Sequence, residues 1–137
     1  VNHQLERCGD ISVNIIQRVK PLLNYGNLLK EAKVFEMGDM ARKMFRDAID
    51  SFINQDIKLA EEIGEQDNIV DNFNKQMFYL LIEKMKSNPE LIEPSAHLIV
   101  LSRHIERLAD HSTNIAEDVI FMIRAEIVTH KHKLEKK

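Results

Sequence analysis

Hydrophobic residues return along this chain at helical spacing almost throughout. In the C-terminal third they are separated by alternating steps of three and four residues, which is typical of a long helix packed nearly parallel to its neighbours. No stretch alternates long enough to predict a strand. The residues of this last seam are Leu98, Leu101, Ile105, Leu108, Ser112, Ile115, Val119 and Met122. The pattern predicts helices over about 2–19, 29–54, 57–86 and 95–127.

Glycine and proline are scarce and mark the ends of these helices. Pro21 ends the first one, because the residue before a proline avoids helical angles, and the turn 24–27 follows. Asp56 is expected to cap the third helix, and Pro89 suits a first helical position before the fourth. Short connections make long neighbouring helices antiparallel. We therefore predict an all-α, antiparallel helical bundle.

Two of the predicted helices share a polar pattern. Residues 5–15 return, shifted by 100 positions, as residues 105–115, with the pattern Glu-Arg-x-x-Asp-x-Ser-x-Asn-Ile in both. The apolar positions drift, as at Cys8 and Leu108. Packing would keep apolar character, because a core tolerates swaps of similar volume. The repeat indicates a second role beside packing.

The repeat carries a pair of acids four residues apart, which are neighbours on one helix face. We expect both copies to lie on the outer face, off the apolar seam. Like charges at this spacing destabilise an isolated helix by a few tenths of a kcal/mol, roughly, and a bound cation reverses that sign. Carboxylate oxygens suit hard cations. The candidate metal ligands are Glu6 and Asp10, Glu106 and Asp110, and a third pair at the same spacing, Asp67 and Asp71.

Other interpretations of these acids stay open. They are also what a solvated helix face looks like, and Arg103 and Arg107 are placed to neutralise Glu106 and Asp110 as surface ion pairs, worth at most about 1 kcal/mol. We expect one or more metal ions, with Fe, Mn, Mg or Zn as candidates.

Composition narrows the class of protein. A chain of 137 residues with net charge -3 suits one globular domain and argues against a nucleic-acid partner. One cysteine, Cys8, indicates a reducing compartment and a buried thiol. The longest apolar run, 77–82, is too short to insert into a membrane. The chain starts without Met inside a helical pattern, so we interpret it as a piece of a longer protein.

Catalysis finds no support in the motifs. A di-iron bundle enzyme needs Glu-x-x-His on two helices, and no Glu here has His three residues later. Phosphate-cradling glycine loops, paired-cysteine zinc motifs and nucleophile elbows are missing from the sequence. We predict that the chain is not an enzyme, and a di-metal bundle enzyme is the remote alternative.

The repeated segment resembles the signature of the PhoU family of phosphate-uptake regulators, at residues 105–120 and again at 5–15. Residues 56–63, followed by 67–71, resemble the family's middle helix. PhoU-like proteins consist of two similar three-helix bundles. The resemblance implies that residues 1–22 are the last-helix remnant of a first repeat, that 28–128 form a complete second repeat, and that 129–137 are a basic tail. We expect the tail to be a solvated helix end, with a contact to phosphate or a membrane surface as the alternative.

The resemblance also implies a function. The family is described as cytoplasmic, acting between the phosphate ABC transporter, through its ATPase, and a sensor histidine kinase, with metal bound at Glu/Asp-x-x-x-Asp motifs. Those motifs correspond to Glu6 and Asp10, Asp67 and Asp71, and Glu106 and Asp110. We further expect a homo-oligomer, a dimer. The alternative is a cytosolic PhoU-like domain of a sodium-phosphate cotransporter. Two departures stand out: Asn74 replaces a usual acid, and 95–97 read Ser-Ala-His instead of a basic stretch.

Overall fold

The structure of the chain is a computed structural model, and it describes residues 2–135. Within this range every regular element is a helix or a short 3-10 turn, which confirms the predicted all-α class. The elements are α1 (Asn2–Val19), η1 (Lys20–Leu22), α2 (Gly26–Ala32), α3 (Val34–Asn54), α4 (Ile57–Ser87), η2 (Pro89–Leu91) and α5 (Ile92–Glu135).

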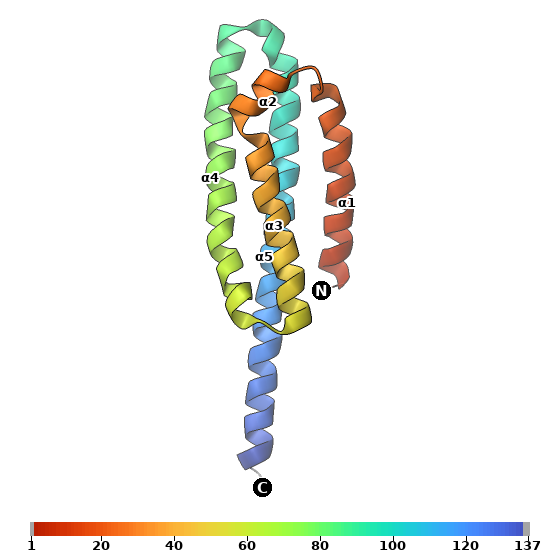
Figure 1. Cartoon of the computed structure of the whole chain (residues 1–137), viewed down its shortest axis with the longest axis vertical. Coiled ribbons are helices and arrows are strands. Elements are labelled where there is room, and N and C mark those ends of the chain that lie inside the picture. The colour runs from red at the N-terminus through yellow and green to blue at the C-terminus, as the bar shows by residue number, and fades with distance from the viewer. Residues whose placement is uncertain (1, 136–137) are drawn as a thin grey trace.

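Helices α3, α4 and α5 pack against one another as an antiparallel three-helix bundle, and α1 lies along α5 (Figure 1). The short α2 lies at the end where α4 turns into α5. Helix α5 has 44 residues, about 66 Å of helix. It runs the whole length of the bundle and continues beyond the ends of α3 and α4. The predicted antiparallel bundle is therefore present, with α5 as its common member.

The core is built from the hydrophobic faces that the sequence pattern predicted. Helix α5 buries its seam from Leu98 to Val119, and α3 buries positions spaced by three and four residues. Met122, the last residue of the predicted seam, is 42% exposed, and two phenylalanines of α3 are also less buried: Phe45 is half-buried and Phe52 is 39% exposed. Each phenylalanine follows a core position by one residue, so a turn of about 100° carries it towards the rim of the bundle. The core positions of α3 are Val34, Met37, Ala41, Met44, Ala48 and Ser51.

The predicted helix over 29–54 was wrong as a single element. It is divided at Lys33, whose backbone is left-handed (φ 57°, ψ 33°), and the Lys33 N–H donates to the carbonyl of Lys30. The apolar spacing did not reveal this break, because Ala32 and Val34 are buried on either side of it. Glycine is the usual residue at such a position, and a lysine gave no signal.

The other helix ends follow the predicted chemistry more closely. Asp56 caps α4, since its Oδ1 accepts a hydrogen bond from the Leu59 N–H at 3.1 Å. Helix α5 begins at Ile92 and ends at Glu135 instead of spanning 95–127. Pro94 is accommodated in the first turn, where its missing N–H costs no intrahelical bond. The predicted basic tail is helical and exposed as far as Glu135, and its last two residues lie outside the described range.

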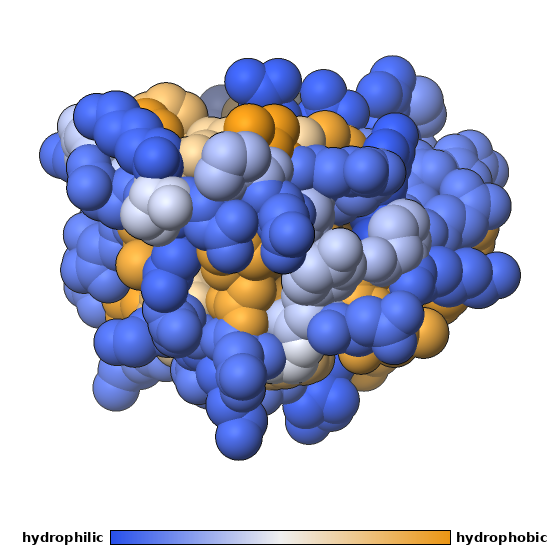
Figure 2. Space-filling view, turned by 90° about the horizontal axis from the view of Figure 1, so that it is seen from above, coloured by the Kyte–Doolittle hydropathy of each residue, from blue (hydrophilic) through white to orange (hydrophobic). Residues whose placement is uncertain are grey.

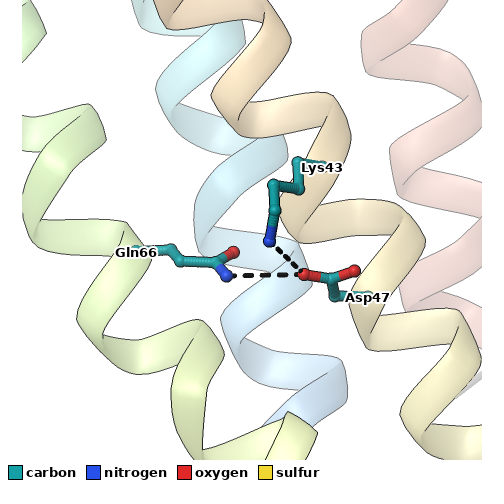
Figure 3. A network of polar contacts seen from close by, with 3 residues as sticks. All are labelled: Lys43, Asp47 and Gln66. Atoms are coloured by element: carbon teal, nitrogen blue, oxygen red, sulfur yellow. Dashed lines mark hydrogen bonds and ion pairs between the residues drawn. The ribbon is translucent and has the colours of Figure 1, made fainter.

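A polar contact fixes α3 beside α4 (Figure 3). The Lys43 Nζ lies 2.8 Å from Asp47 Oδ2, and the amide of Gln66 on α4 donates to the same oxygen at 3.4 Å. The Asp47 side chain is only 16% exposed, so water competes weakly for this contact. The contact fixes the position of Gln66, and of the adjacent Asp67, along the axis of the bundle relative to α3.

The surface is mostly hydrophilic, with hydrophobic residues between the polar ones. Seen from the end that carries α2, apolar residues reach the surface inside a hydrophilic rim (Figure 2). Near this end Leu23 is 70% exposed and Ile92 49% exposed. No helix among residues 2–135 combines the length and the apolar character that crossing a bilayer requires.

Candidate functional site

Two of the predicted acidic pairs come together between α4 and α5. Because these helices run antiparallel, Asp67 and Asp71 on α4 lie beside Glu106 and Asp110 on α5, and we call these four residues the acidic group. Asn74, one turn after Asp71, donates from Nδ2 to Glu106 Oε2 at 2.9 Å. This hydrogen bond sets the register of the two acidic pairs.

Asp67 is the member of the acidic group with the most perturbed titration. Burial, followed by the charges of Asp71, Asp110 and Glu106 in that order, together raise the pKa of Asp67 to about 6. Its Oδ1 is buried without a hydrogen-bond partner among the described residues. A buried carboxylate oxygen without a partner is costly when ionised. The site therefore favours either a proton or a cation at this position.

The two acids of α5 are shifted in the same direction. Burial, then Asp110 and Asp71, raise the pKa of Glu106, while the Asn74 hydrogen bond and the Arg103 charge oppose the rise. Burial and Asp71 raise the pKa of Asp110, and His111 opposes this. Desolvation and mutual repulsion thus act on three of the four carboxyls, as expected for negative charges gathered in a partly dry groove.

The predicted outer-face position of Glu106 was therefore wrong in part. Glu106 and Asp67 are half-buried in the groove between α4 and α5, whereas Asp71 and Asp110 are exposed. The helical phase correctly placed these acids off the seam of α5, but α4 covers the face beside that seam. Within residues 2–135 neither Arg103 nor Arg107 forms an ion pair within 4.0 Å with these acids.

The third predicted pair stands apart from this group. Glu6 and Asp10 are exposed on α1, which packs on α5 through Cys8 and Ile11. No described side chain joins either acid through a hydrogen bond or an ion pair of the structure. Metal binding by this pair stays a prediction.

Two polar contacts near the site were not predicted as functional. Asn74 was noticed only as a departure from the family pattern, although its spacing from Asp67 and Asp71 places it on the same face of α4. His111 has no counterpart in the other copy of the repeat, where Ile11 stands. In the structure His111 Nδ1 lies 2.5 Å from Gln4 Oε1 and joins α5 to α1. Burial, then the charge of Arg7, lower the pKa of His111.

The chemistry of the acidic group fits a hard cation. It offers carboxylate oxygens from two helices, and the buried Oδ1 of Asp67 has no hydrogen-bond partner among residues 2–135. As the side chains stand, no three His, Cys, Asp or Glu residues in the described range are close enough to enclose one ion. Binding a cation here therefore requires the carboxylates of the acidic group to move closer together.

Fold and site together define a helical-bundle domain with carboxylates gathered between two of its helices. Residues 34–119 match the family model of the PhoU domain, which is more than half of the chain. The chain belongs to the PhoU family.

Several relatives agree with this assignment. A phosphate-specific transport system accessory protein PhoU homolog of Xylella fastidiosa is 30% identical over 122 residues, 89% of this chain and 52% of the relative. The homolog of Zymomonas mobilis is 34% identical over 117 residues, covering 85% and 49%. The crystal structure of PhoU from Pseudomonas aeruginosa superposes with a TM-score of 0.81 at 32% identity, covering 89% and 59%. The chain spans about half the length of the curated relatives it matches.

Proposed function

We propose that this chain is a regulatory, non-enzymatic part of a phosphate transport system. The support is membership of the PhoU family together with relatives named as accessory proteins of phosphate-specific transport. The proposed partners are the ATPase of a phosphate ABC transporter and a sensor histidine kinase, met on the cytoplasmic side of the membrane. A dimer is the proposed oligomeric state.

The observation that carries the mechanism is the buried, unpartnered Oδ1 of Asp67 among three further carboxylates. We propose that Asp67, Asp71, Glu106 and Asp110 hold a metal ion, with Fe, Mn, Mg or Zn as candidates. Such an ion supplies positive charge that offsets carboxylate repulsion. Asn74 keeps Glu106 turned towards the groove by hydrogen bonding to Oε2. The net charge of this surface then depends on whether a metal ion is bound to the four mutually repelling carboxylates.

The metal proposal is tested on the chain freed of metal and then incubated with Mn²⁺, Mg²⁺, Zn²⁺ or anaerobic Fe²⁺. Bound metal is measured by elemental analysis after gel filtration, and the thermal midpoint by circular dichroism. We expect binding of at least one of these ions and a rise in the midpoint, because a ligand that binds only the folded state stabilises it. The double variant Asp67→Asn with Asp110→Asn should lose both effects.

The matched control is Glu6→Gln with Asp10→Asn, which removes an acidic pair of the same spacing from α1. This variant should keep the metal that binds between α4 and α5, and it would lose only an ion held separately by Glu6 and Asp10. Equal metal content in the Asp67/Asp110 variant and the unchanged chain would contradict the proposed site. Loss of bound metal in the Glu6/Asp10 variant alone would show that the metal site lies on α1.

The partner proposal needs a separate measurement. The purified transporter ATPase and the cytosolic part of the kinase are each titrated with the chain, with and without the metal identified above. Tighter binding in the presence of metal supports a docking role that responds to metal. Identical affinities in both conditions would separate docking from the acidic group.

A further inference from the structure

A groove beside the acidic group has chemistry of a different kind. It lies between α4 and α5, has a volume of about 310 Å³, and adjoins the acidic group through Asn74, which lines it. We call it the aromatic groove. Its volume is at the lower end of natural ligand sites, so it suits one or two side chains of a partner. Its principal lining residues are Asn74, Lys75, Phe78, Tyr79, Ile99 and Arg103.

Each wall of the groove contributes an unpaired cation. Lys75 on α4 and Arg103 on α5 are both exposed, and neither lies within 4.0 Å of an acid in the described part of the chain. The charge of Arg103 reaches Glu106 only as a through-space effect on its pKa. The planar guanidinium is suited to two parallel hydrogen bonds with one carboxylate. The groove thus offers two points for a negatively charged side chain.

The groove also exposes aromatic surface. Phe78 is 49% exposed and Tyr79 60% exposed, and their rings meet edge to face at 5.8 Å between centroids. The buried Met77 and Leu81 form part of the lining beneath them. Exposed Tyr and Arg beside a desolvated apolar floor are the residue types that contribute most binding energy in protein interfaces.

The charges also discriminate between classes of partner. The chain has a net charge of -3, and the acidic group lies next to the groove. A polyanion such as a nucleic acid would extend over those carboxylates and be repelled. A short protein segment with one or two carboxylates would contact Lys75 and Arg103 while covering fewer of those acids.

We propose that the aromatic groove binds a protein segment that presents an aromatic or large aliphatic side chain flanked by acidic residues. The apolar side chain packs on Phe78 and Tyr79, and the carboxylates bind Arg103 and Lys75. This assigns a surface to the partner of the proposed function and rests on that function only for the existence of such a partner. It does not require a bound metal.

The chain contains no tryptophan, so Tyr79→Trp places a single fluorescent reporter in the groove. The probe is an acetylated, amidated peptide with Phe at its centre between glutamates. Two matched peptides replace either Phe by Ser or each Glu by Lys. We expect the Glu/Phe peptide alone to change the fluorescence and to shift the backbone NMR signals of residues 74–79 and 99–103.

Charge reversal tests the role of the two cations. Lys75→Glu with Arg103→Glu should weaken peptide binding about tenfold or more, the effect expected for breaking a charged contact at an interface. The matched control, Lys58→Glu with Lys131→Glu, reverses two exposed cations of the same helices outside the groove and should bind normally. Phe78→Ala, which keeps all charges, should weaken binding as well.

Several results would overturn the proposal. They are no binding at millimolar peptide, equal binding of the Ser or Lys peptides, signal shifts away from the groove, or equal shifts caused by inorganic phosphate alone. The purified transporter ATPase provides the second arm. If the ATPase binds the unchanged chain and the charge-reversed variant equally, the groove assignment fails and the proposed function stands. If the peptide binds as expected but neither ATPase nor kinase does, the proposed function fails and the groove stands.

Discussion

Helix packing buries the Asp67 side chain, and electrostatic repulsion from neighbouring acids opposes its ionisation. It follows Gln66, whose amide donates to Asp47 on α3 at 3.4 Å, and its own Oδ1 is buried without a hydrogen-bond partner among residues 2–135. Its neighbours in space are three further acids. The ionised form of Asp67 is therefore unfavourable unless a proton or a cation neutralises its charge.

This position predicts a pH-dependent effect of Asp67→Asn. The pKa of Asp67 is about 6 in the folded chain, above the ordinary aspartate value of 3.8, so the folded state binds the proton more tightly than the unfolded state between these values. The free energy of unfolding consequently falls as the pH rises from about 4 to about 6. In metal-free buffer, Asp67→Asn should raise the free energy of unfolding at pH 7.5 by about 1 kcal/mol after allowance for solvent screening.

Urea unfolding of both proteins at pH 7.5 and pH 4 measures this difference. The gain should shrink at pH 4, where the carboxyl is protonated in the folded state and no longer carries a charge that burial and the neighbouring acids oppose. The exposed Asp118→Asn provides a control with the same loss of charge. A variant less stable than the original at pH 7.5 would show that Asp67 is satisfied when ionised.

At the level of single residues, the sequence identified the chemically important side chains, but it did not predict how deeply they are buried. The spacing of the acids and the repeat identified the carboxylates that the structure gathers between α4 and α5. It did not predict that Glu106 and Asp67 are half-buried, because that depends on how closely α4 approaches α5. The Asn74 contact and the cations of the aromatic groove also arise only from the pairing of the two helices.

At the level of elements, residues that end helices in an unusual conformation were the main difficulty. Lys33 and Gln55 are both left-handed, with φ of 57° and 51°, and neither is the glycine that favours this conformation. The second end was predicted anyway, because Asp56 provides a recognisable cap for the next helix. The end at Lys33 has no such signal and was missed.

The strain at Lys33 predicts that Lys33→Gly is stabilising. Removing Cβ relieves a left-handed conformation that costs about 1 kcal/mol for a residue other than glycine, so we expect a gain of roughly 0.5–1 kcal/mol in the free energy of unfolding. Lys30→Gly, inside α2, is the matched control and should lose a similar amount. Urea unfolding of both variants decides the matter; destabilisation of the two alike would mean that the Lys33 side chain contributes more than its backbone costs.

At the level of the whole molecule, the bundle is organised around α5. Helices α1, α3 and α4 each pack on α5, and α3 and α4 also pack on each other. The seam that predicted this arrangement was the clearest pattern in the sequence. Which helix lies on which face of α5 was not predictable, because every amphipathic helix here offers a similar apolar stripe.

The placement of α1 has a consequence for how the molecule opens. Because α1 packs mainly on α5, it can detach as one cooperative unit while α3, α4 and α5 keep their shared core. Cys8, on α1, is the single cysteine and only 1% exposed, and burial raises the pKa of its thiol to about 11. Reagent therefore reaches the thiolate only during an opening event.

We predict that thiol labelling of Cys8 in native buffer reports an opening free energy below that of global unfolding, with a weaker dependence on urea. Amide hydrogen exchange should agree: protons of α1 exchange through this opening, whereas those of α3, α4 and the packed part of α5 wait for global unfolding. Labelling with the free energy and urea dependence of global unfolding would contradict a separate opening of α1. If this opening is found, the acidic group and the aromatic groove belong to the unit of α3, α4 and α5, which stays folded while α1 detaches.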